Sequence, residues 1–64
     1  MKKSELERIL RGHGSKLERE GGSHSVWINV STDSRASVPR HSELKRGTVR
    51  AICKELGVPL PSGF

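Results

Sequence analysis

A histidine at the start of the clearest strand pattern is the first candidate for chemistry in this sequence. His24 follows closely on the pair Gly21-Gly22, and the residues after it fall into two alternating sets, one with Val26, Ile28 and Val30 and the other with Ser25, Trp27, Asn29 and Ser31. Histidine exchanges a proton near neutral pH, with an ordinary pKa of about 6.5, so it acts as a general acid or base without a metal. That chemistry suits the cleavage of an RNA phosphodiester, where the adjacent ribose 2'-hydroxyl supplies the nucleophile.

Structural roles compete with catalysis at this position. A histidine after a Gly-Gly turn is more often a turn residue or a hydrogen-bonding polar group than a catalyst, so spacing alone does not establish a function. His13 adjoins the glycines that end a helical pattern, where its charge suits the helix dipole. His13, His24 and His41 include no pair with ligand spacing on one element, so no metal site is expected.

The elements that must hold His24 follow from the apolar periodicity. A helix is expected at about residues 5–12, after a capping box that begins at Ser4. A second helix follows Thr48 as its N-cap and ends at Gly57, and three strand segments lie between the helices. The sequence therefore predicts an α+β fold in the order α-β-β-β-α, with a three-stranded antiparallel sheet and both helices packed on one face.

The turns set the pairing of the strands. Gly21-Gly22 can supply the positive φ angles of a two-residue hairpin turn, and a three-residue loop is expected before the third strand. The expected pairs are Arg19 with His24, Leu17 with Val26, Lys16 with Trp27, Val30 with Ala36 and Ile28 with Val38. The residues expected on the helix-covered face are Leu17, Val26, Ile28, Val30, Ala36 and Val38.

This register gathers cationic and polar side chains around His24, at the rim of the helix-covered face. Arg19 is its cross-strand neighbour, and Arg40 should lie beside Val26 on the third strand. The connector after Arg40 leads to the second helix, whose N-terminal amides and dipole favour a phosphate. The candidate RNA-binding residues are therefore Arg19, Arg40, His41, Lys16, Trp27 and Thr48.

Two of these residues have open alternatives. Trp27 points away from the helices in this register, where it would stack on an RNA base, anchor a protein partner or be covered by the tail that ends at Phe64. His41 either touches a phosphate or is solvated. Cys53 falls on the apolar stripe of the second helix, so it is expected in the core rather than as a nucleophile.

Length, charge and cysteine content bound the protein further. Its 64 residues make one domain, residues 1–64, with a flexible tail at 60–64, and its net charge of +5 favours nucleic acid, an acidic protein or a lipid surface as partner. The single cysteine excludes an internal disulfide, which fits a reducing compartment. No apolar run approaches the roughly 20 residues of a membrane span, and no signal-peptide core is present, so a cytoplasmic protein is expected.

Short motifs along nearly the whole chain resemble the HicA toxins, the YcfA-like mRNA interferases of bacterial and archaeal toxin–antitoxin systems. The motifs are Lys3-Ser4-Glu5-Leu6, Gly22-Ser23-His24, Val38-Pro39-Arg40-His41, Leu44-Lys45-Arg46-Gly47-Thr48-Val49-Arg50-Ala51-Ile52 and Lys54-Glu55-Leu56-Gly57-Val58. One departure is Ser15, where the family often has a bulky apolar residue, and it predicts thinner packing of the first strand.

The resemblance implies a fold like the double-stranded RNA-binding domain and translation-independent cleavage of mRNA and tmRNA that arrests growth under stress. It also implies a cognate HicB antitoxin that hides the catalytic histidine, which maps onto His24, and no metal or organic cofactor. The free toxin is expected to be a monomer that forms a hetero-oligomer with its antitoxin. The alternatives are a non-catalytic RNA-binding module of the same fold and a protein-interaction module whose basic surface meets an acidic partner.

Overall fold

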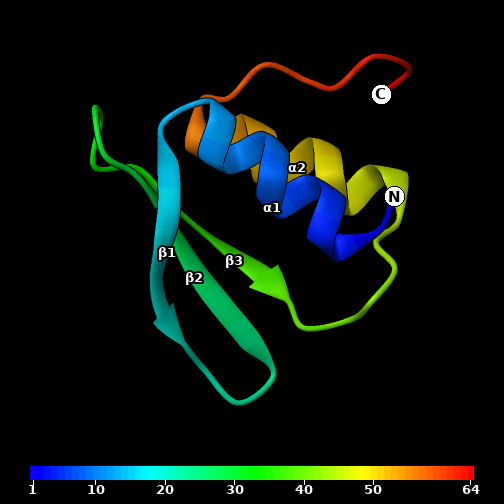
Figure 1. Ribbon diagram of the computed structural model, residues 1–64, viewed down its shortest axis with the longest axis horizontal. Coiled ribbons are helices and arrows are strands. Elements are labelled where there is room, and N and C mark those ends of the chain that lie inside the picture. The colour runs from blue at the N-terminus through cyan, green and yellow to red at the C-terminus, as the bar shows by residue number, and fades with distance from the viewer.

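Two helices and three strands make up the chain in the computed structural model, which describes residues 1–64. The elements are α1 (Lys3–Gly12), β1 (Ser15–Glu20), β2 (His24–Asn29), β3 (Arg35–Pro39) and α2 (Arg46–Leu56). The strands form one antiparallel sheet in the order β1-β2-β3, and both helices lie on the same side of it (Figure 1). The predicted α+β fold is confirmed. Neither helix has the length and apolarity that a membrane crossing requires.

The pairing of β1 with β2 differs from the predicted one because β1 carries a bulge at Glu18. Leu17 lies opposite Trp27 and Arg19 lies opposite Val26, with the register shift between these two pairs. An extra residue in one strand changes which side chains share a face. Leu17 therefore shares the face of Trp27, while Arg19 shares the opposite face with Val26.

The turn between β1 and β2 is centred on Gly22 and Ser23, one residue later than predicted. The backbone N–H of Gly21 donates to the carbonyl oxygen of His24 at 2.7 Å, which closes the hairpin around the two residues between them. Neither Gly21 nor Gly22 has a positive φ. The predicted pairing of Arg19 with His24 and the predicted use of positive φ angles are both wrong.

The pairing of β2 with β3 also differs from the prediction. The observed pairs include Trp27 with Ala36 and Ser25 with Val38, in place of Val30 with Ala36 and Ile28 with Val38. A shift by an odd number of residues exchanges the two faces of a strand. The face of β2 that was expected to point away from the helices therefore points toward them.

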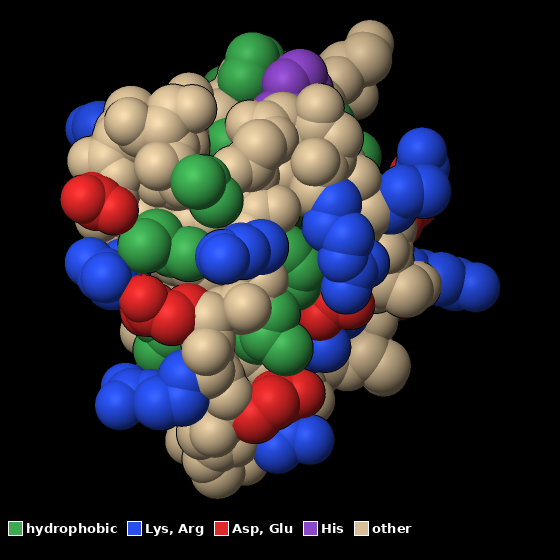
Figure 2. All heavy atoms as spheres, turned by 60° about the vertical axis from the view of Figure 1, so that its left-hand side comes forward, with side chains coloured by type: hydrophobic (Ala, Val, Ile, Leu, Met, Phe, Trp, Pro, Cys, Tyr) green, Lys and Arg blue, Asp and Glu red, His purple; other side chains and the backbone are tan.

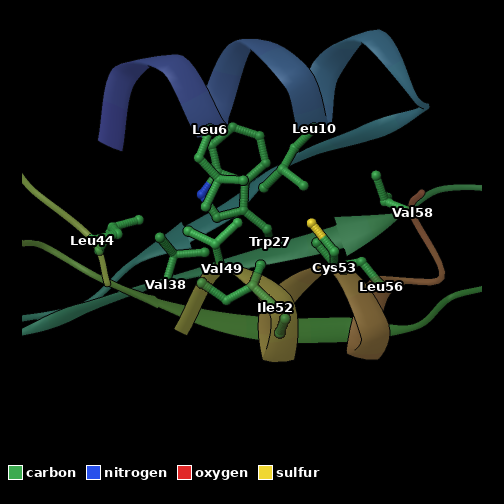
Figure 3. Close-up of a cluster of buried hydrophobic side chains, with 11 residues drawn as sticks. Leu6, Leu10, Trp27, Val38, Leu44, Val49, Ile52, Cys53, Leu56 and Val58 are labelled. Carbon is green, nitrogen blue, oxygen red and sulfur yellow. The ribbon is translucent and has the colours of Figure 1, made fainter. Parts of the chain in front are cut away.

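Trp27 lies at the centre of the core, with an exposed fraction of 0%. Figure 3 shows its indole beneath α1, close to Leu6 and Leu10, and the Arg11 guanidinium lies 5.2 Å from the ring centroid in a cation–π contact. The predicted outward position of Trp27 is wrong because its indole is the largest apolar group in the chain and gains most from burial. The core cluster comprises Leu6, Leu10, Trp27, Ala36, Val38, Leu44, Val49, Ile52, Cys53, Leu56 and Val58.

Polar side chains on the same face of β2 are buried with hydrogen-bond partners. Asn29 Nδ2 donates to the carbonyl oxygen of Leu56 at 2.7 Å, and Ser25 Oγ donates to Glu20 Oε1 at 2.6 Å. Paired in this way, a buried polar group avoids the cost of desolvation without a partner. The hydroxyl of Ser15 and the indole Nε1 of Trp27 are different, since both are buried without a hydrogen-bond partner.

The face of the sheet away from the helices is called the open face. Ile28 lies on it and is still only 7% exposed. Arg35, which is opposite Ile28 on β3, donates from Nε and Nη2 to the two carboxylate oxygens of Glu18 at 2.8 and 2.9 Å. This bidentate pair crosses β2 and covers Ile28, and the Arg35 hydrogen bonds lower the pKa of Glu18.

The start of α1 is held by backbone pairing rather than by the predicted capping box. Its N-cap residue is Lys2, and no side-chain cap is present, so the capping role predicted for Ser4 is wrong. The backbone N–H of Leu44 instead donates to the carbonyl oxygen of Met1 at 2.8 Å. This contact ties the connector before α2 to the N-terminus and helps to bury Leu44.

The N-terminus of α2 differs from the predicted one, and its C-terminus agrees with it. The helix starts before Thr48, and Lys45 is its N-cap without a side-chain hydrogen bond, so the predicted N-cap is wrong. Gly57 is confirmed as the C-cap, since it has a φ of 69° and is followed by Val58, whose N–H donates to the carbonyl oxygen of Cys53 at 2.9 Å. Cys53 is fully buried, as predicted, and burial raises the pKa of its thiol.

The C-terminal residues run back over the helices, as the red end of the chain in Figure 1 shows. Phe64 packs half-buried against the core cluster. The Arg46 guanidinium lies 5.4 Å from the centroid of the Phe64 ring. The tail therefore covers the core cluster near α2.

Replacing Trp27 tests its place in the core. Trp27→Ala should lower the free energy of unfolding by about 3–5 kcal/mol, or unfold the protein outright, because it leaves a cavity beneath α1. Val30→Ala is the control, since Val30 is 58% exposed, and it should change that free energy by about 0.5 kcal/mol or less. Urea denaturation followed by circular dichroism measures both. Equal effects would contradict the burial of the indole.

Candidate active site

His24 is the first residue of β2 and lies exposed on the open face, not at the rim of the helix-covered face as predicted. It lines a shallow hollow of about 330 Å³, called here the His24 hollow. All three strands contribute to it, because Arg19 lies opposite Val26 on one side and Ser37 lies opposite Val26 on the other. The lining residues are Arg19, Gly21, Gly22, Ser23, His24, Val26 and Ser37.

The imidazole of His24 has one nitrogen engaged and one free. Its Nδ1 lies 3.1 Å from the hydroxyl oxygen of Ser23. A serine hydroxyl can donate or accept, so it pairs with either neutral tautomer of the ring. Nε2 has no hydrogen-bond partner within the chain and is the nitrogen available for proton transfer.

Gly21 is required by a close approach of two backbone segments. A Cβ atom at this position would lie 2.5 Å from the carbonyl oxygen of His24, closer than real Cβ atoms come to other atoms. A Cβ at Gly22 would meet nothing within 4 Å. The close approach therefore requires a glycine at position 21, whereas a side chain at position 22 would meet no steric obstacle.

Arg40 follows β3 and contacts the turn that carries His24, called here the glycine turn (residues 21–23). Its backbone N–H donates to the carbonyl oxygen of Ser23 at 3.1 Å, and its Nη1 donates to that of Gly21 at 3.0 Å. The predicted place of Arg40 beside Val26 is wrong, since Ser37 lies there. The structure nevertheless brings Arg40 to the candidate site.

Glu20 supports Arg40 from the end of β1. Glu20 Oε1 accepts the hydrogen bond from Ser25 Oγ and lies 3.8 Å from Arg40 Nε. The Ser25 hydrogen bond, with smaller contributions from the charges of Arg40 and Lys3, lowers the pKa of the Glu20 carboxyl group. Glu20 is therefore an anion at neutral pH.

The other predicted RNA-binding residues lie outside the His24 hollow. Lys16 is exposed on β1, opposite Ile28, and Trp27 is in the core, where it cannot stack on a base. His41 and Thr48 line a separate hollow of about 280 Å³ near the start of α2. No three His, Cys, Asp or Glu side chains come together as metal ligands would.

A family model of the HicA toxin of bacterial toxin–antitoxin systems matches residues 4–58. The chain belongs to the HicA toxins. The matched region includes the glycine turn, His24, Arg40 and all five helices and strands except the first residue of α1. No curated protein and no solved structure gives a significant match. Family membership makes this chain a toxin and implies an antitoxin partner.

Sequence reasoning missed the roles of two serines in this HicA toxin. Ser37 enters the hollow because β3 pairs with β2 in an unpredicted register, and Ser25 reaches Glu20 because its face points toward the helices. Both follow from the β2 register. No local motif marks that register, and a correct placement of Trp27 is the one signal that would have indicated it.

Charge around the site is mixed rather than uniformly basic. Figure 2 shows basic and acidic side chains interleaved on the side of the toxin where β1 lies. Arg35 is paired with Glu18 and Arg40 lies beside Glu20. Arg19 is the cation that lines the His24 hollow, and it has no acidic partner within ion-pair distance.

Alanine at the two glycines tests the close approach in the turn. Gly21→Ala should displace the His24 carbonyl, because the added methyl group overlaps it, and should shift the backbone amide resonances of residues 21–25. Gly22→Ala has open space around the added methyl group and should leave those resonances close to wild type. Two-dimensional ¹H–¹⁵N NMR makes the comparison. Equal perturbation by the two variants would contradict the requirement for Gly21.

Proposed function

We propose that this HicA toxin is a metal-independent endoribonuclease that cleaves mRNA and tmRNA in the cytoplasm and that a HicB antitoxin inhibits it. One observation carries the proposal: an exposed imidazole with a free Nε2 shares a hollow with the unpaired guanidinium of Arg19. The pair offers a group that moves protons near neutral pH and a permanent cation for phosphate. Membership of the HicA family supports the same chemistry.

The reaction requires two proton transfers at one phosphodiester. His24 Nε2 takes the proton of the ribose 2'-hydroxyl as O2' attacks phosphorus, and the imidazolium then gives that proton to the leaving 5' oxygen. The O2'–P bond forms and the P–O5' bond breaks, which leaves a cyclic phosphate and a free 5'-hydroxyl. Arg19 stabilises the charge that develops on the non-bridging oxygens. The Ser23 hydroxyl suits this sequence, since it can follow the ring through both protonation states.

RNA would lie along the open face and be held through its backbone. Lys16 is exposed on this face beyond Arg19. His41 and Thr48 would take a phosphate farther along the strand, in their separate hollow. The chain has only two aromatic residues and both pack with the core, so the open face offers no stacking platform for bases.

The antitoxin would act on the same surface. The His24 hollow is open to solvent, so a HicB protein that covers it would block access of RNA to Nε2. We expect a monomeric free toxin and a hetero-oligomer with HicB.

A non-catalytic RNA-binding module is the second candidate. It is favoured by the lack of a second proton-transfer group, since His24 is the only imidazole or carboxylate that lines the hollow. A nuclease with one such group must use it twice, whereas a binding module needs none.

Cleavage by His24→Ala separates the two candidates. With a chelator present, the wild type should cut a defined single-stranded RNA, and His24→Ala should cut it about 10²- to 10⁴-fold more slowly, because the proton-transfer group is gone. His13→Ala is the matched control, since His13 lies exposed beyond α1. A 2'-deoxy substitution at the cleaved step should block the wild type. RNA that is bound but uncut by the wild type would favour the binding module.

The salt dependence of RNA binding tests Arg19. Arg19→Ala, placed in the His24→Ala background to prevent cleavage, should weaken binding and reduce the slope of log K against log salt by about 0.7 for each phosphate that Arg19 neutralises. Arg8→Ala removes the same charge from an exposed position on α1 and should leave the slope nearly unchanged. Fluorescence anisotropy of labelled RNA measures both. Identical slopes for the two variants would remove Arg19 from the interface.

A further inference from the structure

A continuous set of polar contacts reaches the glycine turn from inside the protein. It begins at Ser25, which is 1% exposed and donates to Glu20 at 2.6 Å. Glu20 Oε1 lies 3.8 Å from Arg40 Nε, and the same guanidinium donates from Nη1 to the carbonyl oxygen of Gly21, while the Arg40 backbone N–H donates to that of Ser23. These contacts connect a buried side chain of β2 to the two carbonyl groups on either side of Gly22.

The position of His24 depends on this turn. Its backbone is held on one side by the hydrogen bond from Gly21, and its ring is held by Ser23. Both of these residues are themselves bound by Arg40. A change in the Arg40 side chain therefore reaches the imidazole through the Gly21 carbonyl, whereas the bond to Ser23 comes from the Arg40 backbone and does not depend on the side chain. No contact joins Arg40 to the ring.

We propose that Arg40, oriented by Glu20, is a positioning residue that fixes the glycine turn and thereby the imidazole of His24. This inference rests on the proposed nuclease function for its kinetic consequence but not for its structural one. Only arginine fits the role, because its planar guanidinium can reach the Gly21 carbonyl and face Glu20 at the same time, whereas a lysine offers a single point charge.

Neutralising Glu20 tests the positioning role, because a simple charge effect and a loss of positioning predict opposite changes in activity. Glu20 is an acidic residue close to the site of a polyanionic substrate, so its neutralisation should favour RNA binding through charge alone. If Glu20 orients Arg40, the same change should slow the chemical step. Glu20→Gln keeps an oxygen that can accept from Ser25 and removes only the charge that faces Arg40.

The experiment measures kcat and KM for single-stranded RNA cleavage by the wild type, Glu20→Gln, Arg40→Lys and the control Glu55→Gln, which removes a negative charge from an exposed position on α2. Glu20→Gln should lower kcat about two- to fivefold with an unchanged or lower KM, the scale of an exposed ion pair. Arg40→Lys should lower kcat about 10- to 100-fold with little change in KM, the scale of a misplaced catalytic group. Glu55→Gln should match the wild type.

An unchanged or higher kcat for Glu20→Gln, or a raised KM with normal kcat for Arg40→Lys, would overturn the positioning role and leave Arg40 as a phosphate ligand. The nuclease proposal is judged separately by wild type against His24→Ala. If the wild type does not cut RNA, ¹⁵N relaxation of residues 21–24 still decides the inference. Greater mobility of the turn in both variants supports it, and unchanged relaxation refutes it.

Discussion

The burial of Trp27 beneath α1 is the constraint on which the rest of the structure depends. Side chains alternate along a strand, so an indole in the core sends His24, Val26 and Ile28 to the opposite face of β2. The candidate catalytic residue is therefore exposed because the largest apolar side chain occupies the helix-covered face. The helices thus determine indirectly where the site lies. They bury one face of β2, and the site forms on the other face.

Strict alternation along β1 would conflict with this arrangement. Without a bulge, Leu17 and Arg19 would share one face, and either a leucine would leave the helix side or an arginine would enter it. The bulge at Glu18 resolves the conflict and brings the Arg19 guanidinium to the His24 hollow. It also frees Glu18 to bind Arg35 across the sheet. The single bulge at Glu18 thus has two effects. It brings Arg19 to the His24 hollow, and it lets Glu18 pair with Arg35 over Ile28.

Features that depend on neighbouring residues were predictable from the sequence, and features that depend on distant ones were not. The apolar stripe of α2, its end at Gly57 and the candidate His24 follow from local spacing. The register of β2 does not, because its two alternating sets both carry apolar residues. The choice between them rests on the volume of Trp27 and on the hydrogen bond from Asn29 to Leu56 at the end of α2. The contact of Arg40 with the glycine turn depends on that register and was missed with it.

The candidate site is open to solvent, so a partner protein can reach it. The hairpin end that carries the glycine turn projects away from both helices (Figure 1), and no segment of the chain covers the His24 hollow. A toxin of a toxin–antitoxin system is inhibited by its antitoxin. The exposed, protruding glycine turn is accessible to such a partner. Under the proposed function, a turn held rigid by Glu20 and Arg40 would present the same ordered surface to RNA and to the antitoxin, and neither would lose binding free energy to ordering it. The contacts of Glu20 and Arg40 that position His24 for catalysis would then also hold the surface that the antitoxin binds.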